Sequence, residues 1–439
     1  MPAPQLIANR TASSTTTLQN VRPALTFLTD PKLSLTSHPS VQIALCGHLQ
    51  PIPLPKTSIC CSTAILQNSA VLLNAICFTG ALHEAIARDV STTPQRLFKH
   101  PTTTSSPQQD GFRHKALSLT LLNQLLTSTQ SCISEATILA VTVLLVAEAI
   151  SGDTSATAAH AKGLARVIEV YGGEEILAPA IGTLIRLADV KAATVTQAPP
   201  TYTLPGYLRR RFSQPESHML LRNNERLPLL GSSFSTPNLS HRLSGGLKRC
   251  LNYIRHLILV AEQYSNNSNL ATTYSIDDFV ALEHHLLSPP QEEFLSKLEN
   301  CIRLALLLYS NTALWKTPVY FGWVVVLRGA LKEALLALNW EVEVRKSGRL
   351  LVWMLFLGGH AAIGQEGEEG AWWMERLRGL AVEWLGLRGW REVVGVLEGF
   401  LYVDLVSGRA WEGVWRVCMS GSVRREVVVV PKHLCERYT

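Results

Sequence analysis

The sequence predicts an all-α protein: a globular array of many helices with one long inserted linker. Apolar residues recur at helical spacing through most of the chain. The composition, 47% hydrophobic and only 17% charged, favours helices packed against helices with little solvated surface to spare. The longest uncharged apolar stretches, 138–147 and 350–364, are shorter than the roughly 18 residues that a membrane span needs. They therefore predict buried core helices.

Composition divides the chain into five segments. Residues 1–58 are rich in Thr, Ser and Pro with weak periodicity, which predicts a largely disordered arm. Two parts of a helical domain are expected at 59–197 and 247–420, with a flexible basic linker at 198–246 between them and a tail at 421–439. The N-terminus has no basic region followed by an apolar run, so we expect no secretory signal.

Helices are expected in order along both helical parts. Apolar residues from Cys61 to Leu82 predict the first. The later helices are predicted over 112–126, 133–150, 174–193, 247–263, 276–287, 290–310, 322–338, 348–363, 371–385, 390–403 and 410–418. A further helix is predicted between the turn at 151–154 and the glycines at 172 and 173. Val427–Val430, in the tail, fits one short strand.

The most informative segment is Ala158–Gly173, a helix rich in small residues. Asp153 or Thr154 can cap its N-terminus by accepting a hydrogen bond from a free backbone N–H. Gly172 and Gly173 are expected to end it, because glycine readily takes the left-handed conformation that follows a helix.

Residues 198–246 differ from their surroundings. They hold six prolines, many Ser and Asn, and the run Arg209, Arg210 and Arg211. A stretch of about fifty such residues is much longer than the usual connection inside a compact domain. Three interpretations of the arginine run compete: a solvated linker, a nuclear-import signal, or a weak nucleic-acid contact.

The overall charge gives little support to nucleic-acid binding. Forty Lys and Arg against thirty-four Asp and Glu leave a formal net charge of +6. This is far from the dense positive charge of a protein that binds nucleic acid by charge alone. The nine cysteines follow no framework, which favours reduced thiols in the cytosol or nucleus.

The sequence shows no catalytic or metal-binding pattern. His83-Glu84 resembles the start of a zinc-protease helix, but Ala87 stands where the second histidine is needed. In Glu283-His284-His285 the two histidines point to different helix faces, which argues against a shared metal ion. Neither a phosphate-binding glycine loop nor a Gly-x-Ser-x-Gly elbow occurs. We therefore expect no enzyme, no cofactor and no metal.

Four pieces of the sequence occur in the order known from one family. They are 112–123 (Phe-Arg-His-Lys-Ala-Leu-Ser-Leu-Thr-Leu-Leu-Asn), 134–148, 160–202 and 351–415. The third contains His160-Ala-Lys-Gly-Leu164, Gly172-Gly173 and an Asp189 motif in which Leu187 replaces an aromatic residue. Together these pieces resemble the fungal-specific transcription factor domain, the helical regulatory region usually found C-terminal to a Zn2Cys6 DNA-binding domain.

The resemblance implies structural roles for a set of motif residues. His160 and Gly163 are expected to allow close helix approach, and the tryptophans to fill helix junctions. The full set is His160, Gly163, Leu164, Gly172, Gly173, Asp189, Trp353, Trp390, Trp411 and Trp415.

The chain departs from the family in its cysteines. Cys46, Cys60, Cys61 and Cys77 lack the C-x2-C-x6-C spacing of a zinc cluster, so direct DNA contact is not carried over to this chain. The resemblance implies a nuclear regulator of transcription that acts through protein contacts, with other transcription regulators or a second copy as partner. The alternative is a cytosolic helical scaffold. A hydrophobic effector between helices fits a bundle, but the sequence names no residue for it.

Overall fold

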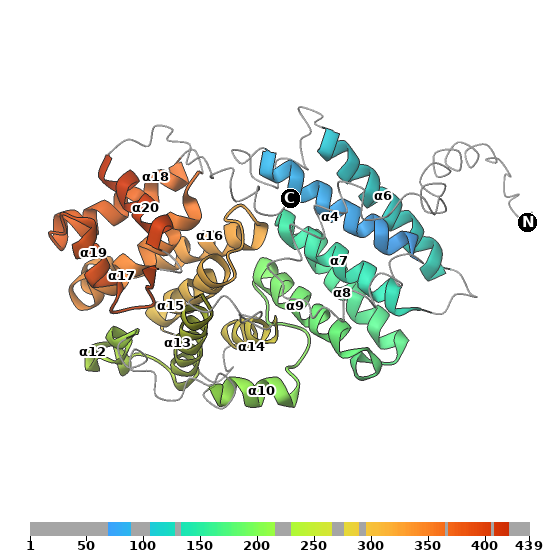
Figure 1. The fold of residues 1–439 in the computed structure, drawn as a ribbon, viewed down its shortest axis with the longest axis horizontal. Helices are drawn as coiled ribbons and strands as arrows, with labels where there is room; N and C mark the ends of the chain where they lie inside the picture. The colour runs from blue at the N-terminus through green and yellow to red at the C-terminus, as the bar shows by residue number, and fades with distance from the viewer. Residues whose placement is uncertain are drawn as a thin grey trace, which may run out of the picture.

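The computed structural model describes residues 69–88, 106–127, 133–215, 230–265, 276–288, 296–364, 368–404 and 408–420. Every regular element in these ranges is a helix, which confirms the predicted all-α fold (Figure 1). No helix among these residues is long and apolar enough to cross a membrane. The expected arm at 1–58, the tail at 421–439 and the strand Val427–Val430 lie outside the described residues.

The first group of helices lies together at one end of the molecule (Figure 1). α4 packs against α6 and α7, and α7 packs against α8 and α9. Their bounds are α4 Ala70–Arg88, α6 Ser106–Thr127, α7 Glu135–Ser151, α8 Thr154–Tyr171 and α9 Pro179–Thr196. The helix expected over 174–193 is instead a short 3-10 turn, Glu174–Ile176, followed by α9, whose start is fixed by Pro179 at its first position.

Helix α8 has the boundaries that its local sequence favours. The Asp153 side chain accepts a hydrogen bond from the Ala156 N–H at 3.0 Å, so Asp153 is the cap. The helix ends at Tyr171, and Gly172 and Gly173 follow with φ of 116° and 103°. Only glycine adopts these backbone angles without strain.

The second group contains the helices from residue 245 onward. α15 packs against α16 and α17, and α18, α19 and α20 also contact α17. Their bounds are α13 Gly245–Ser265, α14 Ile276–Leu287, α15 Lys297–Tyr309, α16 Gly322–Leu336, α17 Trp340–Ala362, α18 Glu368–Arg378, α19 Trp390–Leu397 and α20 Arg409–Ser420. α17 starts earlier than the helix expected over 348–363, because it continues N-terminally across a kink at Ser347.

The described parts of residues 198–246 are packed, which corrects the expectation of a flexible linker. They form α10 (Gly206–Ser213), a 3-10 turn (Ser232–Ser235) and α12 (Pro237–Ser240). Two of the six prolines start helices instead of breaking structure: Pro205 lies at the N-cap of α10 and Pro237 at the first position of α12. Seven described apolar residues of this segment are buried: Leu204, Leu208, Phe212, Leu230, Phe234, Leu239 and Leu243.

The two groups of helices meet where α9 packs against α14 and α16 and where α7 packs against α16. The backbones approach closely there at Gly322, the first residue of α16. A side chain at Gly322 would overlap the backbone of Gly152 and the carbonyl oxygen of Ala149, at the end of α7. Glycine at this position therefore sets the distance between the two groups.

Gly163 does not have the close contact that was expected of it. It lies on the exposed face of α8, with no atom within 4 Å of the place a side chain would occupy. The helix instead buries Leu164, Val167 and Ile168. The expectation fails because a small residue permits a close approach but does not fix which helix face turns inward.

These two glycines give a matched test of the packing. Gly322→Ala is expected to lower the free energy of unfolding by at least about 1–3 kcal/mol, because the methyl group meets backbone atoms that cannot rotate away. Gly163→Ala is expected to raise it by about 0.5–1 kcal/mol, because alanine favours a helix and the site is open. Urea denaturation of both variants measures the difference. A Gly322→Ala protein as stable as the wild type would contradict the described contact of α16 with α7.

Candidate functional site

Helix α14 carries most of the buried polar contacts between elements. Its apolar residues Ile276, Phe279, Val280, Ala281, Leu282, Leu286 and Leu287 are buried, and it packs against α9, α10, α13 and α15. Among them lie the carboxylates Asp278 and Glu283, also buried, and the half-buried His284 and His285. A polar group placed so deeply costs free energy unless it is paired, so each needs a partner from another helix.

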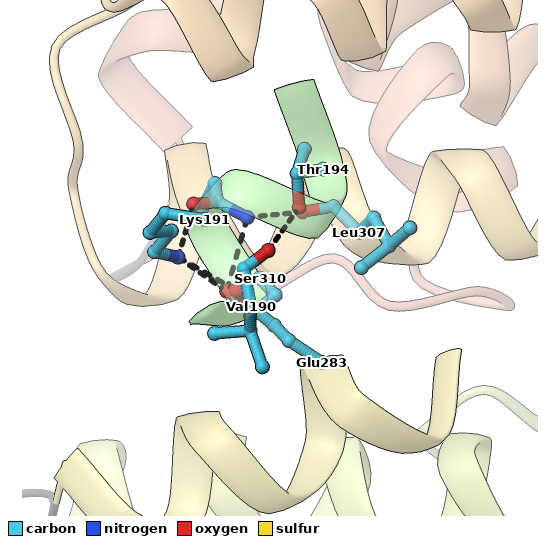
Figure 2. Close-up of polar contacts among 7 residues, drawn as sticks. Val190, Lys191, Thr194, Glu283, Leu307 and Ser310 are labelled. Carbon is cyan, nitrogen blue, oxygen red and sulfur yellow. Dashed lines mark hydrogen bonds and ion pairs between the residues drawn. The ribbon is translucent and has the colours of Figure 1, made fainter. Parts of the chain in front are cut away.

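Glu283 pairs with Lys191 of α9. The Lys191 Nζ donates to both carboxylate oxygens of Glu283, at 2.8 Å to Oε1 and 2.6 Å to Oε2. The two side chains are 4% and 0% exposed, so this ion pair lies fully inside the protein. Figure 2 shows them approaching from two separate helices.

The turn that follows α15 completes this cluster. It is a π-helical turn, Ser310–Leu314, which brings two consecutive polar side chains inward. Asn311 Oδ1 accepts from Lys191 Nζ at 2.8 Å, and Asn311 Nδ2 donates to Glu283 Oε1 at 3.0 Å. Ser310 Oγ donates to the same oxygen at 3.2 Å (Figure 2). We call Lys191, Glu283, Ser310 and Asn311 the buried ion-pair cluster.

The chemistry of this cluster is structural. Burial lowers the pKa of Lys191, and the Glu283 carboxylate acts in the opposite direction. The ammonium group has three protons and three acceptor oxygens in hydrogen-bond range, so it is fully satisfied. It also lies 4.9 Å from the centre of the Trp315 ring and 5.6 Å from that of Trp323. Lys191 is therefore fully engaged in joining α9 to α14 and to the turn after α15.

Asp189, a residue of the expected family motif, holds the turn after α9. Its Oδ2 accepts from the Tyr202 N–H at 2.9 Å. His284 Nε2 donates to the Tyr202 carbonyl oxygen at 3.0 Å, so Tyr202 is held on both sides of its backbone. Burial raises the pKa of Asp189, which the Tyr202 N–H opposes, and burial lowers the pKa of His284. Leu187, in the place of the motif's aromatic residue, is buried.

Comparison with known proteins identifies the family. The profile of the fungal specific transcription factor domain matches residues 45–394 of this 439-residue chain. The chain belongs to this family. No curated protein and no solved structure matches it. The family is one of transcription factors and not of enzymes, which agrees with the structural role of the buried ion-pair cluster.

The motif tryptophans of this fungal transcription factor domain lie at helix junctions. Trp390, Trp411 and Trp415 surround Phe356 of α17, with ring centres 6.0, 5.9 and 6.4 Å from it. Trp353, also on α17, packs beside Phe234, Tyr309 and Phe400. Trp353 and Trp411 have no exposed surface. These rings join helices to one another.

The motif residues His160 and Leu164 lie on α8, away from the tryptophans. His160 is half-buried, with its Nε2 3.9 Å from Glu148 Oε1 of α7, and burial lowers its pKa. Leu164 is buried in the core. His160 therefore faces the carboxylate of Glu148, which also pairs with Lys115 of α6 at 2.6 Å.

The three arginines of the basic run have different surroundings. Arg209 and Arg210 are exposed on α10. Arg211 turns inward and binds Asp278 through two hydrogen bonds, Nε to Oδ1 at 2.6 Å and Nη2 to Oδ2 at 2.9 Å. Tyr253 Oη donates to the same Asp278 Oδ1 at 2.7 Å. Asp278 thus fixes α10 in place.

Sequence reasoning missed the buried ion-pair cluster. A signal was present, because Lys191 and Glu283 each interrupt an apolar helix in which neighbouring residues are buried. One charge in such a helix predicts a buried partner. It does not say where in the chain the partner lies, and here the two residues are 92 positions apart.

Breaking the cluster is expected to destabilise the domain strongly. Lys191→Met or Glu283→Gln leaves the other charge buried and unpaired, which costs about 3–5 kcal/mol of unfolding free energy. The double variant Lys191→Met, Glu283→Leu is expected to lose less than the sum, because both charges are removed. Arg166→Ala, which removes an exposed pair with Glu169, is the control at under about 1 kcal/mol. Equal losses in urea denaturation for Lys191→Met and Arg166→Ala would contradict a buried pair.

Proposed function

We propose that this protein regulates transcription in the nucleus and does so through protein contacts of its helical domain. The observation that carries the proposal is its membership of the fungal specific transcription factor domain family over residues 45–394. In support, the buried polar groups of the candidate site are consumed in holding helices together. The outer helix faces are therefore what the domain offers to another protein.

In this proposal a partner makes the DNA contact. The chain contains no pair of cysteines with the C-x2-C spacing of a zinc cluster, and its net charge is only +6. The partner is another transcription regulator or a second copy of the chain.

A tethering experiment tests the regulatory role. The whole chain is fused to an unrelated DNA-binding domain and directed to a reporter promoter. Reporter output is expected to change severalfold relative to the DNA-binding domain alone, and pull-down is expected to recover a transcription regulator or the chain itself. An unchanged output together with a tagged protein that stays outside the nucleus would favour the cytosolic scaffold instead.

Nuclear entry is proposed to use the exposed arginines of α10. Arg209 and Arg210 are exposed, whereas Arg211 is engaged with Asp278. The double variant Arg209→Ala, Arg210→Ala is therefore expected to lower the nuclear-to-cytoplasmic ratio of a fluorescent fusion. The control is Arg388→Ala, Arg391→Ala, which removes two exposed arginines elsewhere on the domain. Equal nuclear ratios for the two double variants would contradict a role of α10 in import.

A further inference from the structure

The last residues of helix α10 place two arginines shortly before a serine. Arg210 and Arg211 stand three and two positions before Ser213, the last residue of the helix. Arginine-directed protein kinases recognise this spacing, because their acidic side chains bind two guanidinium groups upstream of the serine that enters the active site. α10 therefore carries a recognition sequence for such a kinase.

The end of α10 is accessible at its outer face. Ser213, Arg209 and Arg210 are all exposed. The Ser213 hydroxyl donates to the Arg209 carbonyl oxygen at 2.9 Å, one turn earlier, and has surface exposure besides. The serine and the first of the two recognition arginines, Arg210, are thus available without any change in the core.

The C-terminal half of α10 contacts α14 through Arg211 and Phe212. Arg211 makes its paired hydrogen bonds with Asp278. Phe212, which is buried, stacks on His285 with ring centres 3.7 Å apart and planes 10° from parallel. A kinase binds its target segment extended and needs the Arg211 guanidinium for itself. Asp278 therefore competes directly with the kinase for Arg211.

We propose that Ser213 is a phosphorylation site for an arginine-directed protein kinase and that the Arg211–Asp278 ion pair controls access to it. The kinase acts when α10 lifts from α14 and exchanges Asp278 for acidic groups of the enzyme. ATP supplies the phosphoryl group. The Ser213 Oγ bonds to the γ-phosphorus, the bond from that phosphorus to the β–γ bridging oxygen breaks, ADP leaves, and the hydroxyl proton passes to the catalytic aspartate of the kinase.

The phosphate would change the charge of the exposed arginine pair. A phosphoserine carries about −1.5 to −2 charges at pH 7, and Arg209 and Arg210 lie four and three positions before it, within one helical turn. It would therefore cancel the local charge of the two arginines. The effect of phosphorylation on import rests on the proposed use of Arg209 and Arg210 in nuclear entry. In that case phosphorylation of Ser213 slows the entry of the protein into the nucleus.

The first experiment is phosphorylation of the purified full-length chain. The probe is the catalytic subunit of cyclic-AMP-dependent protein kinase with ATP, and mass spectrometry locates the phosphate. Ser213 is expected to be the main site, and Ser213→Ala to remove the signal. Ser235→Ala is the matched control, because Ser235 is exposed but has Ser232 and Ser233 where the arginines are required. Absence of phosphate at Ser213 overturns the proposal.

The second experiment tests the control of access. Asp278→Asn weakens the charged hydrogen bonds to Arg211 and is expected to raise the initial rate at Ser213 roughly tenfold. His285→Ala removes the ring under Phe212, leaves the recognition sequence intact and is expected to raise the rate in the same direction. Circular dichroism confirms that each variant folds. Unchanged rates in both folded variants overturn the role of the ion pair.

Import into permeabilised cells separates this proposal from the previous one. The phosphorylated chain is expected to enter nuclei more slowly than the untreated chain, and kinase-treated Ser213→Ala at the untreated rate. If Arg209→Ala, Arg210→Ala enters like the wild type, the import role proposed for α10 fails while the phosphorylation result stands. If that variant is slow and the phosphate has no effect, the charge cancellation is overturned.

Discussion

The arrangement of this domain depends on the buried ion pair between Lys191 and Glu283. α9 is the last helix of the first group and α14 belongs to the second, so the pair joins the two halves of the fold (Figure 1, Figure 2). Both charges are removed from water, and each is tolerable only when the other is in place. A shift of α9 along α14 by one turn would leave two unpaired buried charges. The pair therefore specifies one register between the halves, and Ser310 and Asn311 satisfy the oxygens and protons that remain.

The position of α14 also fixes the contacts that its other polar residues make. Two other residues of α14 bind neighbouring segments: His284 donates a hydrogen bond to the Tyr202 carbonyl oxygen, and Asp278, five residues before Glu283, accepts hydrogen bonds from Arg211. Since α14 is positioned by the pair, so are the turn after α9 and the short helix α10. The arginine run therefore divides into two exposed residues, Arg209 and Arg210, and the half-buried Arg211, which pairs with a carboxylate. The carboxylate of Asp278 thereby decides which arginines of the run remain at the surface.

Close packing of α16 against α7 is the second constraint on how the two halves of the domain meet. Gly322 lies against the end of α7, near the junction that the ion pair defines, and a side chain there would meet backbone. Gly163, in the segment that carries the family resemblance, has open space around it. Around α17 the junctions are filled by large rings, with three tryptophans about Phe356. In the second half of the domain, aromatic rings fill the helix junctions around α17. Where the two halves meet, the close approach of α16 to α7 requires a residue without a side chain at Gly322.

The sequence by itself determined the all-α class, the order of most helices, a cap at Asp153 or Thr154, the glycine stop at Gly172 and Gly173, and the family. These features are encoded within a few neighbouring residues, because apolar spacing, capping and positive φ act within about one or two turns of chain. The tertiary structure alone decided that Lys191 faces Glu283, that Gly322 and not Gly163 marks the close approach, and that 198–215 and 230–246 pack as helices and turns. Each of these depends on a partner distant in the chain. The free energy of burying a charge or excluding a side chain is set by that partner, whose position no local pattern contains.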